Sequence, residues 1–129
     1  MILLDTHVLV WAVAASNKLS RRAAMAIRKA RAEDGLAISA ITLLELANLV
    51  ARGRIQAYGT VEASVRLLTE GVTIRPLTAE IAALATQFPD DYPRDPADRL
   101  IGATARAEGL VLVTHDEKIR SSPLLKTLW

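Results

Sequence analysis

The sequence predicts a three-layer α/β/α fold in which helices cover both faces of a central parallel sheet. Four short apolar runs alternate along the chain with segments of helical composition and period. Each run is apolar at consecutive positions, which is typical of strands that are buried on both faces. This alternation indicates parallel strands joined by helices. The order of the strands in the sheet does not follow from one sequence.

The predicted elements are separated by turn residues. Gly35, Gly71 and Gly109 each stand directly before a predicted strand, where glycine is a common turn residue. The predicted strands are Met1–Leu4, Leu36–Ser39, Val72–Arg75 and Leu110–Val113. The predicted helices are Ser20–Ala32, Ala40–Ala51 with Ser39 as its N-cap, Thr60–Thr69, Thr78–Gln87 and Asp95–Glu108. We expect two helices between strands in the N-terminal part.

Length and composition limit the class of protein. The 129 residues suit one domain, residues 1–129, and a hydrophobic content of 51% argues against disorder. Aromatic residues make up only 4%, which argues against a base-stacking platform like that of an RNA-recognition sheet. There is no cysteine, which excludes disulfides and thiolate metal sites and fits a reducing interior. No apolar run is long enough for a membrane span, so we expect a soluble, cytoplasmic protein with no membrane association.

The cations of the chain include a cluster in the first long helical segment. The net charge of +2 is too small to identify a partner. On a helix, the clustered cations would cover about half of the circumference and could face a phosphate backbone, with Arg22 and Lys29 as candidate RNA contacts. The cluster comprises Arg21, Arg22, Arg28, Lys29 and Arg31. A solvated helix face is the commoner explanation.

Acidic residues follow the first and the last predicted strands. Asp5-Thr6 comes directly after the first strand, and Thr114-His115-Asp116 after the fourth. Ligands of open parallel sheets bind outside the carboxyl ends of the strands, so both segments are candidates for a site. Each also has a local explanation, because an aspartate commonly caps the turn or helix that follows it.

Glu45 belongs to a narrow polar stripe on a helix that is otherwise apolar around most of its circumference. The stripe comprises Thr42, Glu45, Asn48 and Arg52, at spacings of three and four residues. The stripe is either the solvent-facing side of the helix or part of a site. A helix buried this thoroughly keeps a carboxylate only where a cation or a hydrogen-bond donor satisfies it.

Asp95 and Asp98 surround a proline at the start of the last long helix. Asp95 suits the N-cap, Pro96 suits the first helical position, and Asp98 complements the helix dipole in the first turn. This structural explanation is complete by itself. However, a right-handed crossover would bring this helix start to the carboxyl edge of the sheet, beside the other acids. Carboxylates gathered there repel one another unless they are protonated or bound to cations, and oxygen ligands favour Mg²⁺ or Mn²⁺.

Taken in order, these segments resemble the PIN-domain family over essentially the whole chain. They are Asp5-Thr6, the run from Ser39 to Glu45, the run from Asp95 to Ile101, and the run from Val113 to Asp116. No single segment is specific, whereas the ordered set is. More narrowly, the chain resembles the VapC toxins of type II toxin–antitoxin pairs.

The resemblance implies a Mg²⁺- or Mn²⁺-dependent endoribonuclease that hydrolyses RNA phosphodiester bonds, with tRNA or rRNA as target. It further implies a cognate antitoxin that holds the toxicity off, and a homodimer. The acids that match the family are Asp5, Glu45, Asp98 and Asp116, as catalytic residues and metal ligands, with Thr6, Thr114 and Arg99 in support. The match favours Asp98 over Asp95, which is a helix cap, a second-sphere group or an additional ligand.

His7 and Pro93 depart from the family pattern, at positions where many members have Ser or Asn and where a subset has His, respectively. Neither departure removes an acid. His7 and His115 are expected to be structural rather than ligands or bases. Arg99 is expected to contact phosphate or to pair with Glu45 or Asp95. Two alternatives remain open: a nuclease of the same fold in RNA maturation or DNA repair, and a PIN domain that binds RNA or protein without catalysis.

Overall fold

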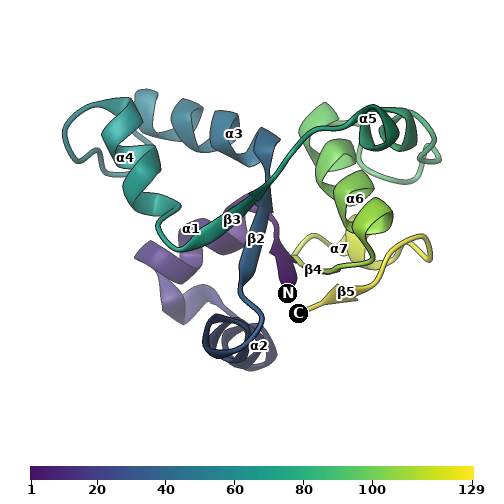
Figure 1. Ribbon diagram of the computed structural model, residues 1–129, viewed down its shortest axis with the longest axis horizontal. Helices are drawn as coiled ribbons and strands as arrows, with labels where there is room; N and C mark the ends of the chain where they lie inside the picture. The colour runs from purple at the N-terminus through teal and green to yellow at the C-terminus, as the bar shows by residue number, and fades with distance from the viewer.

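The computed structural model describes residues 1–129 and contains one five-stranded sheet in the order β3-β2-β1-β4-β5 (Figure 1). All four neighbouring pairs of strands are parallel. The strands are β1 (Ile2–Leu4), β2 (Leu36–Ser39), β3 (Val72–Arg75), β4 (Val111–Val113) and β5 (Thr127–Leu128). The predicted α/β/α class with a central parallel sheet is therefore confirmed.

Seven α-helices and one short 3₁₀-helix (Ser16–Lys18) connect the strands. The α-helices are α1 (Thr6–Ala14), α2 (Arg21–Ala32), α3 (Ala40–Ala51), α4 (Val61–Leu68), α5 (Ala79–Ala85), α6 (Pro96–Glu108) and α7 (Glu117–Arg120). Two α-helices, α1 and α2, lie between β1 and β2, and the sequence had indicated only the second of them. None of the helices combines the length and the apolar character that crossing a membrane requires.

The sheet separates two hydrophobic cores because successive side chains of a strand point to opposite faces. On one face, Leu4, Ile38 and Val113 pack against helices α1 to α4. On the other face, Leu3 and Leu112 pack against α5, α6 and α7, with the loop that follows α5. Figure 1 shows these two groups of helices on either side of the strands. The apolar runs of the sequence are thus strands covered on both faces.

The topology brings residues from distant parts of the chain to one edge of the sheet. β1 lies between β2 and β4, and the backbone N–H of Asp5 extends the ladder by donating to Val113 O at 3.0 Å. On the outer side of β4, Thr114 N donates to Leu128 O at 3.2 Å. Because the strands are parallel, their carboxyl ends meet at this edge.

Candidate active site

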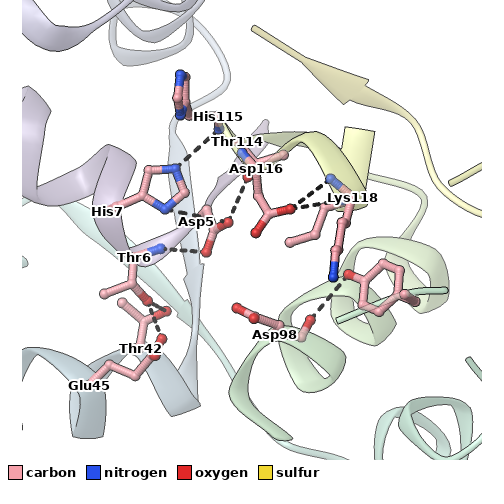
Figure 2. A network of polar contacts seen from close by, with 12 residues as sticks. Asp5, Thr6, His7, Thr42, Glu45, Asp98, Thr114, His115, Asp116 and Lys118 are labelled. Atoms are coloured by element: carbon pink, nitrogen blue, oxygen red, sulfur yellow. Dashed lines mark hydrogen bonds and ion pairs between the residues drawn. The ribbon is translucent and has the colours of Figure 1, made fainter. Parts of the chain in front are cut away.

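Four carboxylates from four different elements surround one region at the carboxyl edge of the sheet. Asp5 stands between β1 and α1, Glu45 in the second turn of α3, Asp98 in the first turn of α6, and Asp116 directly before α7. Figure 2 shows Asp5, Asp98 and Asp116 around a common space, with Glu45 beyond Thr6. These are the four acids that the sequence singled out as catalytic, and the structure brings them together.

Asp5 is the most buried of the four, with only 3% of its surface exposed. One carboxylate oxygen, Oδ1, accepts the backbone N–H of Thr6 at 2.9 Å, so Asp5 caps α1 as expected. The other, Oδ2, accepts the hydroxyl of Thr114 at 2.7 Å and lies 3.7 Å from Nδ1 of His7. The cap and the site are therefore two functions of one side chain.

Thr114 joins two of the carboxylate-bearing segments. Its side chain is fully buried, and its hydroxyl donates to Asp5 while accepting the backbone N–H of Asp116 at 3.1 Å. The proton of the hydroxyl and one of its lone pairs are both used in this arrangement. Thr114 therefore fixes the orientation of Asp5 and the start of the Asp116 turn together.

Thr6 orients the carboxylate of Glu45 through a hydrogen bond. Its hydroxyl donates to Glu45 Oε1 at 2.5 Å and lies 3.0 Å from the hydroxyl of Thr42, which is fully buried. Since the Thr6 proton is used on Glu45, Thr42 is the donor in that second contact. Burial raises the pKa of Glu45, the charges of Asp5 and Asp95 add to the rise, and the bond from Thr6 opposes it. The polar stripe of α3 thus faces the site.

Asp98 shows the effect of the cluster most strongly. Burial raises the pKa of Asp98 to about 7, and the charges of the other four acids contribute to the same rise. Those acids are Asp5, Asp95, Glu45 and Asp116. The backbone carbonyl of Asp98 accepts a hydrogen bond from the hydroxyl of Tyr92 at 3.2 Å. The tyrosine thereby ties the first turn of α6 to the loop before it.

Asp95 and Asp116 are both helix N-caps. Asp95 Oδ1 accepts the backbone N–H of Ala97 at 2.9 Å, and the side chain is otherwise exposed. Asp116 Oδ1 accepts the N–H groups of Lys118 and Ile119 at 2.9 and 3.1 Å, which leaves Oδ2 without a partner. The expected capping role of both residues is found, and the free oxygen of Asp116 faces the cluster (Figure 2).

No lysine or arginine neutralises these acids. The ion pairs of the structure join the N-terminus to Asp34, Arg66 to Glu62 and Arg75 to Glu108, and the cluster has only the contact of His7 with Asp5. Burial lowers the pKa of His7 despite that carboxylate. The site therefore contains several acids, none of which forms an ion pair with a lysine or an arginine.

Arg99 does not pair with Glu45 or Asp95, which was one of its two expected roles. Its guanidinium donates instead to the backbone carbonyls of Pro93, Phe88 and Pro89 at 2.9, 3.0 and 3.2 Å. Arg99 thus holds the loop before α6 against that helix. Its partners are carbonyls of an irregular segment, which no side-chain pattern in the sequence indicates.

The arginines that line a pocket with one of these carboxylates are not the cations proposed from the sequence. Arg22 and Lys29 are exposed on α2, which Figure 1 shows at the lower end of the molecule, whereas α3, which carries Glu45, lies at the upper end. Arg52 and Arg54 instead line a pocket together with Thr6, Glu45, Asn48 and Leu49. Both arginines are exposed and form no ion pair. Arg52 and Asn48 belong to the same polar stripe as Glu45. The helical spacing of the sequence therefore placed Arg52 on the side of Glu45, although Arg52 was not predicted as an RNA contact.

The donor set fits a hard divalent cation. Every side chain of the cluster offers carboxylate oxygens, which suit Mg²⁺ or Mn²⁺. Burial, and after it the charges of the neighbouring acids, raise the pKa of Asp98, and a bound cation would oppose both effects. In the conformation described, no three acidic or imidazole side chains converge on one ligand position, so shared coordination requires rotation of carboxylates.

The fold is a parallel sheet with acidic residues at the carboxyl ends of its strands, and similarity to known proteins identifies its family. A model of the PIN domain matches residues 2–123, and the chain belongs to the PIN-domain family. It is similar to the Mycobacterium tuberculosis protein named Ribonuclease VapC22, at 42% identity over 130 residues that cover 99% of this chain and 98% of the relative.

Solved structures share the fold at lower sequence identity. VapBC2 from Rickettsia felis, bound to a DNA fragment from its promoter, has a TM-score of 0.76 and 21% identity, covering 99% of this chain and 98% of that chain. Mycobacterium tuberculosis VapC20, described as a Sarcin-Ricin loop cleaving toxin, has a TM-score of 0.66 and 18% identity, covering 98% of each chain. At this identity the likeness concerns the fold alone.

Proposed function

We propose that this protein is a Mg²⁺- or Mn²⁺-dependent endoribonuclease, the toxin of a toxin–antitoxin pair. The observation that carries the proposal is the cluster of Asp5, Glu45, Asp98 and Asp116, which no lysine or arginine neutralises. Buried acids persist together when a cation binds them or when they are protonated. The 42% identity to a protein named as a ribonuclease supports hydrolysis of RNA as the reaction.

The residues assigned to the metal are Asp5, Asp98 and Asp116, with Glu45 and Asp95 in the same charged environment. A divalent cation, when bound, supplies water activation and charge neutralisation for hydrolysis of a phosphodiester bond. Oδ2 of Asp116 has no partner in the structure and is available as a ligand.

The threonines of the site orient the acids. Thr114 holds the inner oxygen of Asp5 through a 2.7 Å hydrogen bond, and Thr6 holds Glu45 through one of 2.5 Å. Such bonds from neighbouring side chains fix the direction in which a ligand presents its oxygen. Arg52 and Arg54, next to Glu45, supply positive charge for the phosphates of an RNA strand.

An antitoxin and a second copy of the chain are the proposed protein partners, in the cytoplasm. Several large apolar side chains are exposed around α3 and α4, including Leu44 at 56% and Leu67 at 50%. A pocket in this region is lined by Leu43, Ala47, Val61, Val65 and Ile74 together with three polar residues. Exposed apolar surface of this kind is typical of protein contacts. VapBC toxin–antitoxin complexes among the structures of similar fold support the same assignment.

The decisive experiment incubates the purified protein with total tRNA and with ribosomal RNA, with Mg²⁺, with Mn²⁺ and with EDTA. We expect cleavage only with a metal, and Asp5→Asn should reduce its rate by about 100-fold or more. Asp90→Asn, an exposed acid of the loop before α6, is the matched control and should cleave like the wild type. Mapping of the RNA ends identifies the target and the bond that is cut.

Three results would contradict parts of this proposal. Cleavage that survives Asp5→Asn would indicate a contaminating nuclease. RNA binding without cleavage under either metal would select the non-catalytic alternative. Cleavage without an antitoxin-like reading frame directly beside the coding sequence would favour a nuclease in RNA maturation or DNA repair.

A further inference from the structure

Both tryptophans and both histidines of the chain lie together beside the carboxylates. His7 and Trp11 are one turn apart near the start of α1, His115 follows β4, and Trp129 follows β5. Because β1, β4 and β5 are parallel neighbours, the residues after all three strands reach the same edge of the sheet. We call these four residues the aromatic cluster.

The rings of the aromatic cluster contact one another through edges and tilted faces. The ring centroids of His7 and Trp11 are 5.0 Å apart, those of His115 and Trp129 are 5.1 Å apart, and those of Trp11 and His115 are 5.7 Å apart. Trp11 and Trp129 are 5.9 Å apart. The interplanar angles of these contacts lie between 59° and 72°, so no two of these rings stack face to face.

The protein's one stacked pair is used differently. Phe88 and Tyr92 lie 4.0 Å apart with an interplanar angle of 21°, and both are buried in the core between α5 and α6. In the aromatic cluster, by contrast, His115 is exposed although it contacts three other rings, and Trp11 and Trp129 are half-buried. The aromatic cluster is therefore accessible to another planar ring.

The aromatic cluster adjoins the acids directly. His7 Nδ1 lies 3.7 Å from Asp5 Oδ2, while His7 Nε2 accepts the backbone N–H of His115 at 3.1 Å. In Figure 2 the ring of His7 lies between Asp5 and His115. On the outer side, the ammonium of Lys18 lies 5.9 Å from the centroid of Trp11. A cation next to aromatic rings suits a ligand that has both a base and a phosphate.

We propose that the aromatic cluster binds one nucleobase of single-stranded RNA, next to the phosphodiester bond that the carboxylates address. This inference rests on the proposed function and adds a base-binding subsite to it. Unstacked bases bind proteins by stacking on aromatic side chains and imidazole rings. The low aromatic content argued against a base-stacking sheet, but a chain average does not show that two tryptophans and two histidines gather at one edge.

The test uses the wild-type chain and a hydrolysis-resistant probe, a 2′-O-methyl phosphorothioate oligonucleotide of about six nucleotides, a length within the range of single-strand sites. Binding is followed by tryptophan emission, in EDTA and with Mg²⁺. Since Trp11 and Trp129 are the only tryptophans, every change in emission arises in the aromatic cluster. We expect quenching on binding, and an abasic unit at one position of the probe should abolish the quenching and weaken binding about tenfold.

Variants of His115 locate the effect. His115→Ala should weaken binding of the intact probe about fivefold and leave binding of the abasic probe unchanged. His115→Phe should restore most of the lost affinity, since it returns a ring. Tyr58→Ala removes an exposed aromatic side chain on the loop before α4 and should change neither affinity.

The outcomes of this test are separable from those of the proposed function. If every abasic probe binds as tightly as the intact one, or if tryptophan emission does not change, the base subsite is wrong even when the enzyme cleaves RNA. If base-dependent binding and quenching are found without any metal-dependent cleavage, the subsite stands and the proposed nuclease activity fails. The wild-type measurement decides the inference even if a variant does not fold.

Discussion

Asp98 lies in the first turn of α6, where a carboxylate is favourable to the helix but unfavourable to its neighbours. An acid at a helix N-terminus is stabilised by the helix dipole. Burial and the charges of four nearby acids outweigh this effect, and the pKa of Asp98 rises to about 7. The residue therefore costs stability in the metal-free protein at neutral pH, as expected for a group kept for binding a cation.

Asp98→Asn should stabilise the metal-free protein at alkaline pH. The pKa of Asp98 is about 7 in the folded state and about 3.9 in the unfolded state. Between these pH values the folded state binds a proton that the unfolded state has released, so the stability of the wild type falls as the pH rises through this window. At about pH 8 the free energy of unfolding of the variant should exceed that of the wild type by about 1–2 kcal/mol. This value is discounted for the partial exposure of the side chain. Near pH 4 the advantage should vanish.

Urea unfolding in EDTA at the two pH values measures this difference. Asp90→Asn, an exposed acid of the preceding loop, is the control and should show no pH-dependent gain. An equal gain for Asp98→Asn at both pH values would show that the carboxylate carries no linked proton.

Thr114→Val should lower the cleavage rate more than it lowers stability. Valine has the same shape but leaves Asp5 Oδ2 without a 2.7 Å donor and the N–H of Asp116 without its acceptor. Loss of such an orienting bond costs about 10–100-fold in activity or metal affinity, and about 1–3 kcal/mol in stability. The measurements are the cleavage rate under saturating Mn²⁺ and the thermal midpoint in EDTA.

Thr104→Val provides the matched control for Thr114→Val. Thr104 is also buried, but its hydroxyl bonds to the carbonyl of Leu100 within α6. It should lose some stability and retain the cleavage rate. If both variants lose activity equally, Thr114 has no special role in orienting the acids.

At the scale of elements, the close approach between α6 and the loop before it depends on Gly102. A Cβ at this position would collide with the hydroxyl of Tyr92 and lie 3.0 Å from Cζ of Phe88. With the Arg99 bonds to the loop carbonyls, this packing fixes the start of α6, where Asp98 stands. The glycine is thus needed for contact rather than for its backbone conformation.

Gly102→Ala should destabilise the protein by about 1–2 kcal/mol, although alanine favours a helix more than glycine does, because the crowding against Tyr92 outweighs helix propensity. In a Tyr92→Phe background the same change should cost about 1 kcal/mol less, since the hydroxyl is gone. Chemical unfolding of the two single variants and the double variant measures this coupling. If the losses in the free energy of unfolding of the two single variants add up to the loss of the double variant, the Tyr92 hydroxyl is not what crowds the alanine.

The sequence predicted the first four strands and five helices within a few residues, because their apolar runs and caps are local signals. It did not predict α1 or β5. The segment Thr6–Ala14 is apolar at almost every position and continues the first strand, so it has no helical period to detect. The two residues of β5 gain their extended structure only by pairing with β4.

The same distinction holds for the site. Asp5, Glu45, Asp98 and Asp116 were predicted because each follows a strand end or begins a helix, or lies on a polar stripe. The aromatic cluster was not, because Trp129 reaches it only through β5. The neighbourhood of Arg54 was missed for a similar reason, since it depends on how the chain turns after α3.

For the whole molecule, the distribution of charge predicts where RNA lies. Replacing Arg52 and Arg54 by glutamine should weaken binding of single-stranded RNA and reduce the slope of log K against log salt by about 1.4, the value for two lost phosphate contacts. Arg22→Gln with Lys29→Gln on α2 makes an equal change in net charge and should leave the slope unaltered. Filter binding at several salt concentrations provides both values.

The opposite result would restore the earlier hypothesis for Arg22 and Lys29. A reduced slope for the α2 pair and none for Arg52 and Arg54 would mean that the strand crosses the molecule on the side of α2. Equal reductions would mean that the RNA follows both surfaces.

The pairing of β1 with β4 also determines when, during synthesis, the acid cluster can form. Asp5 is among the first residues made, yet the Thr114 hydroxyl that orients it lies 109 positions later. A growing chain that has not yet released β4 from the ribosome lacks the neighbour of β1 and Asp116 as well. Unfinished chains that lack β4 and Asp116 therefore cannot assemble the acid cluster, so the proposed nuclease activity can arise only after these residues have emerged from the ribosome.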